Sequence, residues 1–263
     1  MARQRPVGTI TRGTTNPNRL RRVDRWISGP QAWRLRRHPR PPVVVDLGYG
    51  ASPTTAVELH ARVRKVRPDA HVVGIEIDPQ RVDAAKPLER EGLAFRRGGF
   101  EVPLEEGARP AVVRAFNVLR QYPESDVETA WGHVLDRLAP DGVFVDGTCD
   151  EIGRKSTWVA VESGGPVSLT ISQRLGGLAK PSDVAERLPK VLIHRNVAGE
   201  PIHAYLRDLD KAWTHAAPQA AWGARQRFLE TARTVSRDWP LLDGPSRWRL
   251  GEITVAWDAV APS

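Results

Sequence analysis

The sequence predicts an α/β fold built on a mostly parallel sheet. Short apolar, β-branched runs alternate with helical patterns between residues 42 and 146. A glycine-rich turn follows the first of these runs, and the chain of 263 residues is long enough to bury a core. Because an alternation of strands and helices implies right-handed crossovers, successive strands should lie parallel in one sheet.

The elements of this core follow one another in a regular order. Strands are expected at residues 43–47, 71–76, 93–97, 111–116 and 143–146, where apolar residues are continuous. Helices are expected at residues 53–66, 79–91 and 125–138. Asp78 should cap the second of these helices, because it precedes a proline.

Residues 1–41 are expected to form a basic helical arm. Residues 1–40 contain eleven arginines and one acid, Asp24, which gives +10 and leaves 8 − 10 = −2 for the rest of the chain. Apolar residues spaced by three and four predict a helix from Asn16 to Ile27, and a second short helix is expected at 31–38. The arm either meets phosphates or is solvated, with its arginines paired to acids of the body.

The predicted organisation continues with a core at 42–175, a helical addition or lid at 176–247 and a C-terminal strand at 248–263. Residues 158–162 and 167–172 flank a Ser-Gly-Gly-Pro turn and should form a β-hairpin. Helix starts are expected near Ser182, Glu200 and Pro218. The last strand, which carries Ile253 and Val255, is expected to return to the core.

Composition excludes several classes of protein. No apolar run approaches the roughly 18 residues that a membrane-spanning helix needs. The arginine-rich N-terminus lacks the apolar stretch of a secretory signal, so a cytoplasmic location is expected. The single cysteine, Cys149, allows no disulfide within the chain and no cysteine-based zinc site.

The strongest local signal is the turn Asp46-Leu-Gly48-Tyr49-Gly50-Ala-Ser-Pro53. Glycines between a buried strand and a helix let a ligand approach the backbone closely. Dinucleotide-binding enzymes require a third glycine where this chain has Pro53. The carboxylate of Asp46 would oppose a pyrophosphate, whereas it suits a cationic ligand.

This turn resembles the first motif of class I S-adenosylmethionine-dependent methyltransferases, which have a Rossmann-like fold. The segment that ends in Ile75-Glu76 resembles the second motif of that family, an acid that closes the second strand. The resemblance implies that Glu76 accepts hydrogen bonds from both ribose hydroxyls of S-adenosylmethionine.

Later segments extend the resemblance to residues 42–148. Phe116-Asn117-Val-Leu resembles the family's segment after the fourth strand, and Leu138-Ala-Pro-Asp141-Gly resembles its turn before the fifth. The cofactor contacts that the resemblance implies come from Asp46, Gly48, Tyr49, Gly50, Glu76, Ile77, Gly99, Phe100 and Asn117.

Two positions depart from the family pattern. Ser52 replaces the frequent third glycine and is a candidate helix cap. Where the family has an acid that contacts adenine, this chain reads Arg97-Gly98-Gly99-Phe100-Glu101. Phe100 either packs on the adenine or is a core aromatic.

The expected function is therefore methyl transfer from S-adenosylmethionine, with a small-molecule acceptor favoured. An RNA acceptor held by the arginine arm and a non-catalytic S-adenosylmethionine-binding protein are the alternatives. The sequence does not identify the acceptor, the oligomeric state or the catalytic base, for which the polar candidates are Tyr122, Glu151, His194 and His203. Cys149 follows the fifth strand, where RNA 5-methylcytosine enzymes have a nucleophile, but a lone cysteine is more often a small core residue.

Overall fold

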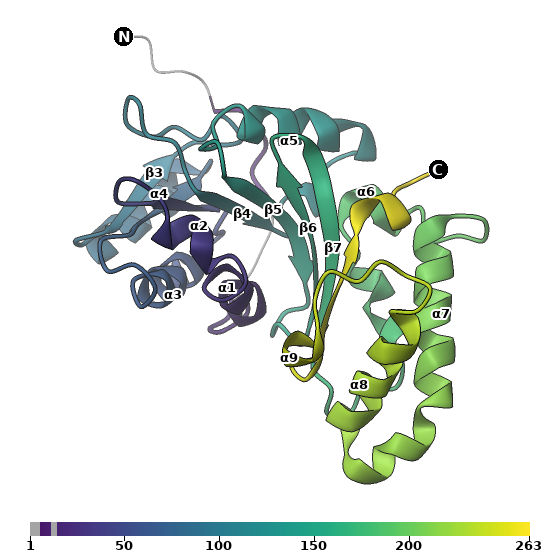
Figure 1. Ribbon diagram of the computed structural model, residues 1–263. Helices are drawn as coiled ribbons and strands as arrows, with labels where there is room; N and C mark the ends of the chain where they lie inside the picture. Colours follow the sequence, from purple (N-terminus) through teal and green to yellow (C-terminus); the bar gives the residue numbers. More distant parts are fainter. Residues whose placement is uncertain (1–5, 12–14) are drawn as a thin grey trace. The chain divides into compact units, whose positions relative to one another are not determined.

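The computed structural model describes residues 6–11 and 15–263, so the predicted arm residues Arg3, Arg5 and Arg12 lie outside the described residues. Among the described residues, eight strands form one sheet in the order β3-β2-β1-β4-β5-β6-β7-β8 (Figure 1). From β1, the sheet grows through β2 to β3 on one side and through β4 to β5 on the other, so the strand order reverses between the parallel strands β1 and β4. The Rossmann-like α/β fold predicted from the sequence is confirmed.

The parallel part of the sheet carries the predicted motifs. It comprises β1 (Val43–Leu47), β2 (His71–Glu76), β3 (Leu93–Arg97) and β4 (Val112–Phe116). β1 pairs in parallel with both β2 and β4, and β2 pairs in parallel with β3. The register places Asp46 between Gly74 of β2 and Arg114 of β4. These bounds agree closely with the predicted strands.

The remaining strands are β5 (Val143–Cys149), β6 (Lys155–Glu162), β7 (Gly165–Gln173) and β8 (Glu252–Ala256). The predicted hairpin and C-terminal strand are present, and β8 pairs antiparallel with β7. The hairpin strands are longer than expected, because the buried polar residues Ser156, Thr157 and Gln173 extend them. The last strand is shorter than expected, because the short helix α9 (Pro245–Trp248) precedes it and a 3₁₀ turn at Trp257–Ala259 ends it.

The helices between the parallel strands are shorter than their patterns predicted. They are α3 (Thr54–Val63), α4 (Pro79–Ala85) and α5 (Val127–Leu135). Asp78 caps α4 as predicted, because its side chain accepts a hydrogen bond from the Gln80 N–H. The predicted extension of α4 to residue 91 is wrong: a 3₁₀ turn follows at Lys86–Leu88, since Pro87 lacks the N–H that an α-helix needs.

The N-terminal arm contains α1 (Arg21–Ile27) and α2 (Ala32–Arg36). Helix α1 begins later than Asn16, where the sequence placed its start. Asn18 has φ +61°, a left-handed conformation that cannot continue a right-handed helix. The apolar side chains of Val23, Trp26 and Ile27 are buried as the helical spacing predicted, and α1 contacts α3.

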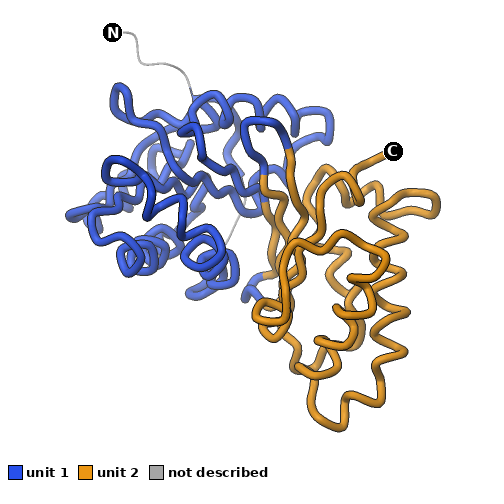
Figure 2. The backbone as a smooth tube through the Cα atoms, viewed as in Figure 1, with its two compact units in different colours: residues 1–146, 151–153, 161–165 blue, residues 147–150, 154–160, 166–263 orange. Residues whose placement is uncertain are grey.

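The chain divides into two compact units, coloured in Figure 2. The first comprises residues 1–146, 151–153 and 161–165, and the second comprises residues 147–150, 154–160 and 166–263. In the second unit, 3₁₀ turns at Pro181–Arg187 and Ala217–Trp222 accompany α6 (Lys190–Ile193), α7 (Pro201–His215) and α8 (Ala224–Val235). α7 packs along α8. The predicted helical character of this region is confirmed.

Within the described ranges, no helix has both the length and the hydropathy to cross a bilayer. The described residues also include no group of histidine, cysteine and acidic side chains able to hold a metal ion.

Candidate functional site

The glycine turn after β1 forms a tight corner. The Gly48 N–H donates to the Ile75 carbonyl at 2.7 Å, which ties the corner to β2. Gly48 and Gly50 have φ values of +70° and +82°, which L-residues with a side chain adopt only at a cost. A Cβ on Gly48 would lie 2.6 Å from a methyl carbon of Val118. The backbone geometry and the close packing therefore both require glycine at this position.

Glu76, at the end of β2, is held against this corner. Its Oε2 accepts the Gly50 N–H at 2.9 Å, and its Oε1 accepts the N–H groups of Ile77 at 3.0 Å and Asp78 at 3.3 Å. Arg81 Nη1 lies 3.6 Å from Oε2. The residue is 1% exposed. Strand, corner and helix start thus fix one carboxylate in a single orientation.

Asp46, at the end of β1, faces a buried arginine. Arg114 Nε and Nη2 donate to the two oxygens of Asp46 at 2.8 and 3.0 Å, and Thr55 Oγ1 donates to Oδ2 at 2.7 Å. Arg114 also pairs with Asp24 of α1. Burial raises the pKa of Asp46, while the Thr55 hydroxyl lowers it, and the bidentate guanidinium favours the ionised form. The charge expected to suit a cationic ligand is therefore already balanced within the protein.

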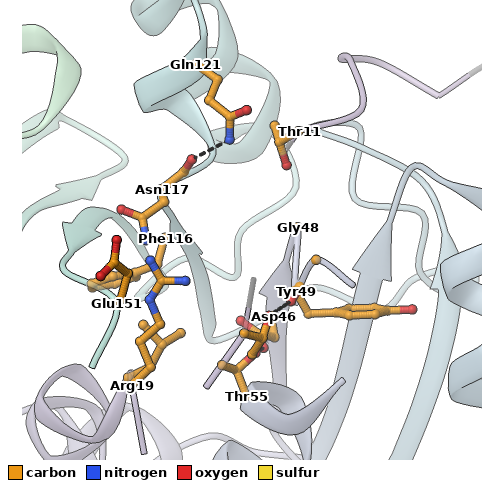
Figure 3. A pocket seen from close by; sticks show the side chains of 13 residues that line it. Thr11, Arg19, Asp46, Gly48, Tyr49, Thr55, Phe116, Asn117, Gln121 and Glu151 are labelled. Carbon is orange, nitrogen blue, oxygen red and sulfur yellow. Dashed lines mark hydrogen bonds between the residues drawn. The ribbon is translucent and has the colours of Figure 1, made fainter. Parts of the chain in front are cut away.

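A cavity of about 180 Å³ opens beside the corner (Figure 3). The backbone of Gly48 and the side chains of Asp46 and Thr55 line one side of it, and Arg19 and Glu151 line another. All of these residues belong to the first unit. The cavity combines polar donors and acceptors with charges of both signs.

A second, much smaller cavity of about 20 Å³ is also lined by Gly48. Gly48 and Glu76 both line it, so the two motif residues face a common space. Val7, Gly8, Thr9 and Thr11 of the N-terminal segment also line it. Phe100 N–H donates to the Val7 carbonyl at 3.0 Å, and Thr9 N–H donates to the Tyr122 hydroxyl at 2.6 Å.

The other residues predicted to contact a cofactor are brought to this edge in different ways. Ile77, Gly99 and Phe100 line the small cavity. Gly99 is covered by the Val7 carbonyl, which would lie 1.9 Å from a Cβ on that glycine. Tyr49 turns its ring away from the large cavity, as Figure 3 shows, and donates its hydroxyl to the Arg81 carbonyl at 3.3 Å.

Asn117 lines the large cavity from the end of β4. Its φ of +60° is the left-handed conformation that asparagine adopts more readily than most residues. Its carbonyl accepts a hydrogen bond from Gln121 Nε2 at 3.1 Å. The predicted site residues therefore gather around one corner, although they are divided between two cavities.

The candidate bases lie in different parts of the chain. Tyr122 and Glu151 line the two cavities of the first unit. His194 and His203 belong to the second unit, where their ring nitrogens lie near Lys190 Nζ at 3.2 Å and Asn196 Oδ1 at 3.3 Å. Cys149 is fully buried, as a core residue would be.

Sequence reasoning missed two contributors to the site, Arg114 and Arg19. A signal existed for Arg114, because a charged residue inside the apolar run Val-Val-Arg-Ala-Phe can be buried only if it is paired. Arg19 was one of many arginines in the arm, and nothing in its spacing distinguished it. Only the fold brings it to the cavity with Glu151.

No protein-family model matches the chain, and no curated protein matches it at the level searched. Solved structures that resemble part of it include the plantazolicin methyltransferase BpumL in complex with a desmethyl analogue and SAH, at 12% identity and a TM-score of 0.37 over 50% of this chain and 47% of that one. A TehB-like SAM-dependent methyltransferase from Corynebacterium glutamicum matches at 21% identity and a TM-score of 0.33, over 51% and 71%. The mitomycin 7-O-methyltransferase MmcR matches at 19% identity and a TM-score of 0.33, over 47% and 36%.

The chain spans 28% to 50% of the length of the first five solved structures that it matches. Because the TM-scores are low and the matches are partial, the activities of these proteins are not transferred to this chain. The strand order itself, together with the antiparallel pair at its C-terminal end, fits a Rossmann-like α/β fold.

Proposed function

We propose that the protein is an S-adenosylmethionine-dependent methyltransferase. The observation that carries the proposal is the meeting of Gly48 and Glu76 at one cavity, where a glycine corner adjoins a fixed carboxylate. A carboxylate with two oxygens in a fixed orientation can accept hydrogen bonds from a pair of neighbouring sugar hydroxyls. The corner lets a ligand approach the backbone closely.

The place of these residues in the sheet supports the proposal. In open α/β sheets, ligands bind beyond the carboxyl ends of the strands, where the strand order reverses. That reversal lies between β1 and β4 in this protein. Gly48 follows β1 and Asn117 follows β4, so the large cavity lies at this switch point.

The residues present match the chemistry of S-adenosylmethionine. Glu76 would hold the ribose, the Gly48–Gly50 backbone would lie beside the cofactor, and Phe100 would lie near the adenine. The bound cofactor supplies a methyl group already activated on its sulfonium. The chain then has to align acceptor and methyl group, and such positioning is a large part of catalysis in group transfer.

The available volume adds a condition to this proposal. The two cavities measure about 180 and 20 Å³, whereas sites for ligands of this size usually enclose about 300–1,000 Å³. Beside Glu76, the small cavity is walled by Val7, Gly8, Thr9 and Thr11 of the N-terminal segment. Binding of the nucleoside therefore requires this N-terminal segment to move away from Gly99 and Tyr122.

The proposed acceptor is a small molecule, since the large cavity measures only about 180 Å³. An RNA acceptor is the second candidate, favoured by the exposed arginines of the arm, Arg21, Arg25, Arg36, Arg37 and Arg40. RNA binding that falls steeply between 50 and 200 mM salt, and that is lost on charge reversal of Arg21 and Arg25, would favour this candidate.

Calorimetry with S-adenosylmethionine, S-adenosylhomocysteine and NAD tests the proposal. Binding of the first two, weakened at least about tenfold by Glu76→Gln, is expected because the neutral amide loses a charged acceptor. Asp83→Asn, at an exposed acid of α4, is the matched control and should bind normally. Tight NAD binding without binding of either methyl compound would reverse the assignment. Cofactor binding without methyl transfer to any acceptor tested would leave the non-catalytic alternative.

A further inference from the structure

A third cavity, of about 540 Å³, lies in the first unit between α4, β3 and the turn that follows β3. No described residue lines both this cavity and either of the two cavities at the glycine corner. Its volume falls within the range of about 300–1,000 Å³ that small-molecule sites usually enclose. The proposed cofactor contacts leave this space unused.

The apolar walls of this third cavity are rigid. Val82 of α4 and Phe95 of β3 line it and are themselves buried, so the core holds both side chains in place. The rings of Pro6, Pro79 and Pro103 also line it. A proline ring loses almost no side-chain freedom when a ligand covers it, and an aromatic ring such as that of Phe95 packs well against another aromatic ring. The walls therefore favour a flat aromatic ligand.

The charges that line the third cavity leave one guanidinium without an acidic partner. Lys86 Nζ donates to Asp83 at 2.7 Å, and Arg96 Nη2 donates to Glu105 at 2.6 Å. Arg97 Nε donates to a backbone carbonyl at 3.3 Å, and among the described residues no acid pairs with Arg97. Its side chain is exposed. Because a guanidinium presents a planar fork of donors, Arg97 can bind one carboxylate through two hydrogen bonds.

The third cavity is joined to the N-terminal segment that covers the glycine corner. Glu101 lines the cavity, and its Oε2 accepts the Val7 N–H at 2.7 Å. Its Oε1 accepts the Gly99 N–H at 3.0 Å, so the backbone engages both oxygens of this acid. Pro6, the residue before Val7, is part of the cavity wall. Displacement of residues 7–11 would therefore move Pro6 and remove one wall.

We propose that the third cavity is an effector site for a flat aromatic carboxylate, with Arg97 binding the carboxylate and the proline and phenylalanine rings holding the aromatic body. Binding at this site does not depend on the proposed function, but its coupling to the cofactor does. Cofactor binding requires residues 7–11 to move, and this movement takes Pro6 out of the wall. The effector binds the closed form more tightly, so effector and cofactor weaken each other by the same factor.

Calorimetry of the full chain with cinnamate and with its uncharged amide, cinnamamide, tests the site. Cinnamate should bind with a low-millimolar or tighter dissociation constant, and cinnamamide at least about tenfold more weakly. Arg97→Gln should weaken cinnamate at least about tenfold and change cinnamamide less than about twofold. Arg90→Gln is the matched control, because Arg90 is exposed, also donates to a backbone carbonyl at 3.3 Å and does not line this cavity.

Titrations with S-adenosylhomocysteine test the coupling. Saturating cinnamate should weaken S-adenosylhomocysteine at least about fivefold and then no further, and Glu76→Gln should leave cinnamate binding unchanged. Loss of cinnamate binding in Glu76→Gln would place cinnamate at the glycine corner and overturn the effector site. No measurable cinnamate binding, or equal binding of acid and amide, would also overturn it.

The failures of the two proposals are distinguishable. Cinnamate binding that depends on Arg97, in a protein that does not bind S-adenosylhomocysteine, would remove the proposed function and leave the carboxylate site. Binding of both ligands without mutual weakening would overturn the coupling, while the proposed function would stand. Thermal unfolding of each variant confirms that the comparison is made on folded protein.

Discussion

Arg114 of β4 and Asp46 of β1 lie side by side in the sheet and form a buried, bidentate ion pair at 2.8 and 3.0 Å. Asp24 of α1 contacts the same guanidinium and also pairs with Arg62, so the two buried acids share Arg114. The pair fixes the end of β1, from which the glycine corner starts. It links the N-terminal arm to the sheet at the place where the cavity forms.

Removal of this arginine should destabilise the fold strongly. Arg114→Met leaves Asp24 and Asp46 without that partner, and such a loss typically costs about 3–5 kcal/mol of unfolding free energy. Urea denaturation of the full chain measures the change. Arg233→Met is the control, because the Arg233–Glu230 pair is exposed and should contribute less than about 1 kcal/mol. Equal losses in the two variants would contradict a special role for the buried arginine.

Gly48→Ala should destabilise the protein and prevent cofactor binding. The left-handed conformation costs an alanine about 1–2 kcal/mol, and the new Cβ would lie 2.6 Å from Val118. Gly107→Ala separates the two effects, since Gly107 has φ +73° with no atom near its Cβ position. Chemical denaturation should give a larger loss for Gly48→Ala. Adding Val118→Ala should recover part of the difference, and full additivity would argue against the clash.

The unfolding free energy of the protein should depend on pH through Asp146, in a defined direction. Burial raises the pKa of Asp146 from 3.8 to about 7, and the hydrogen bond from Trp131 Nε1 opposes this only partly. Because the folded-state pKa is raised, the folded protein binds the proton more tightly. The stabilisation is present below pH 4 and is lost as the pH rises through 7.

Asp146→Asn removes this dependence and keeps an oxygen for the Trp131 N–H. Relative to the unaltered protein, the variant should gain about 2–4 kcal/mol of unfolding free energy between pH 4 and pH 7. Denaturation midpoints measured in parallel at several pH values give the difference. A constant difference across that range would show that the Asp146 pKa is not raised.

Release of the N-terminal segment should favour cofactor binding. Tyr122→Phe removes the hydroxyl that accepts the Thr9 N–H, a contact that stabilises the closed position of residues 7–11. The affinity for S-adenosylhomocysteine should rise about 2- to 10-fold, because the exposed Tyr122 hydroxyl both accepts the Thr9 N–H and donates to the Thr9 carbonyl. Calorimetry measures it.

Tyr205→Phe is the control for that experiment. Tyr205 is buried in the second unit, and its hydroxyl has no hydrogen-bond partner among the described residues. Its loss should leave cofactor affinity unchanged. Weaker binding in Tyr122→Phe would mean that residues 7–11 form part of the bound pocket. The prediction that they move away when the cofactor binds would then be wrong.

The sequence alone determined the parallel strands, their order along the chain and the place of the glycine corner. Continuous β-branched runs have few alternatives to buried strands, and glycines between a strand and a helix mark a close turn. Glu76 was predicted from its place at the end of β2. These features are local, so the pattern of neighbouring residues was enough to find them.

Tertiary structure alone decided what those residues face. Asp46 was expected to meet a ligand, yet Arg114, 68 positions away, bonds both of its oxygens. Arg19 and Glu151 are far apart in the chain and meet only because the turns before α1 and after β5 pack together. Ion pairs and cavity walls depend on long-range packing. Local sequence patterns therefore do not predict which distant side chain will pair with a buried charge.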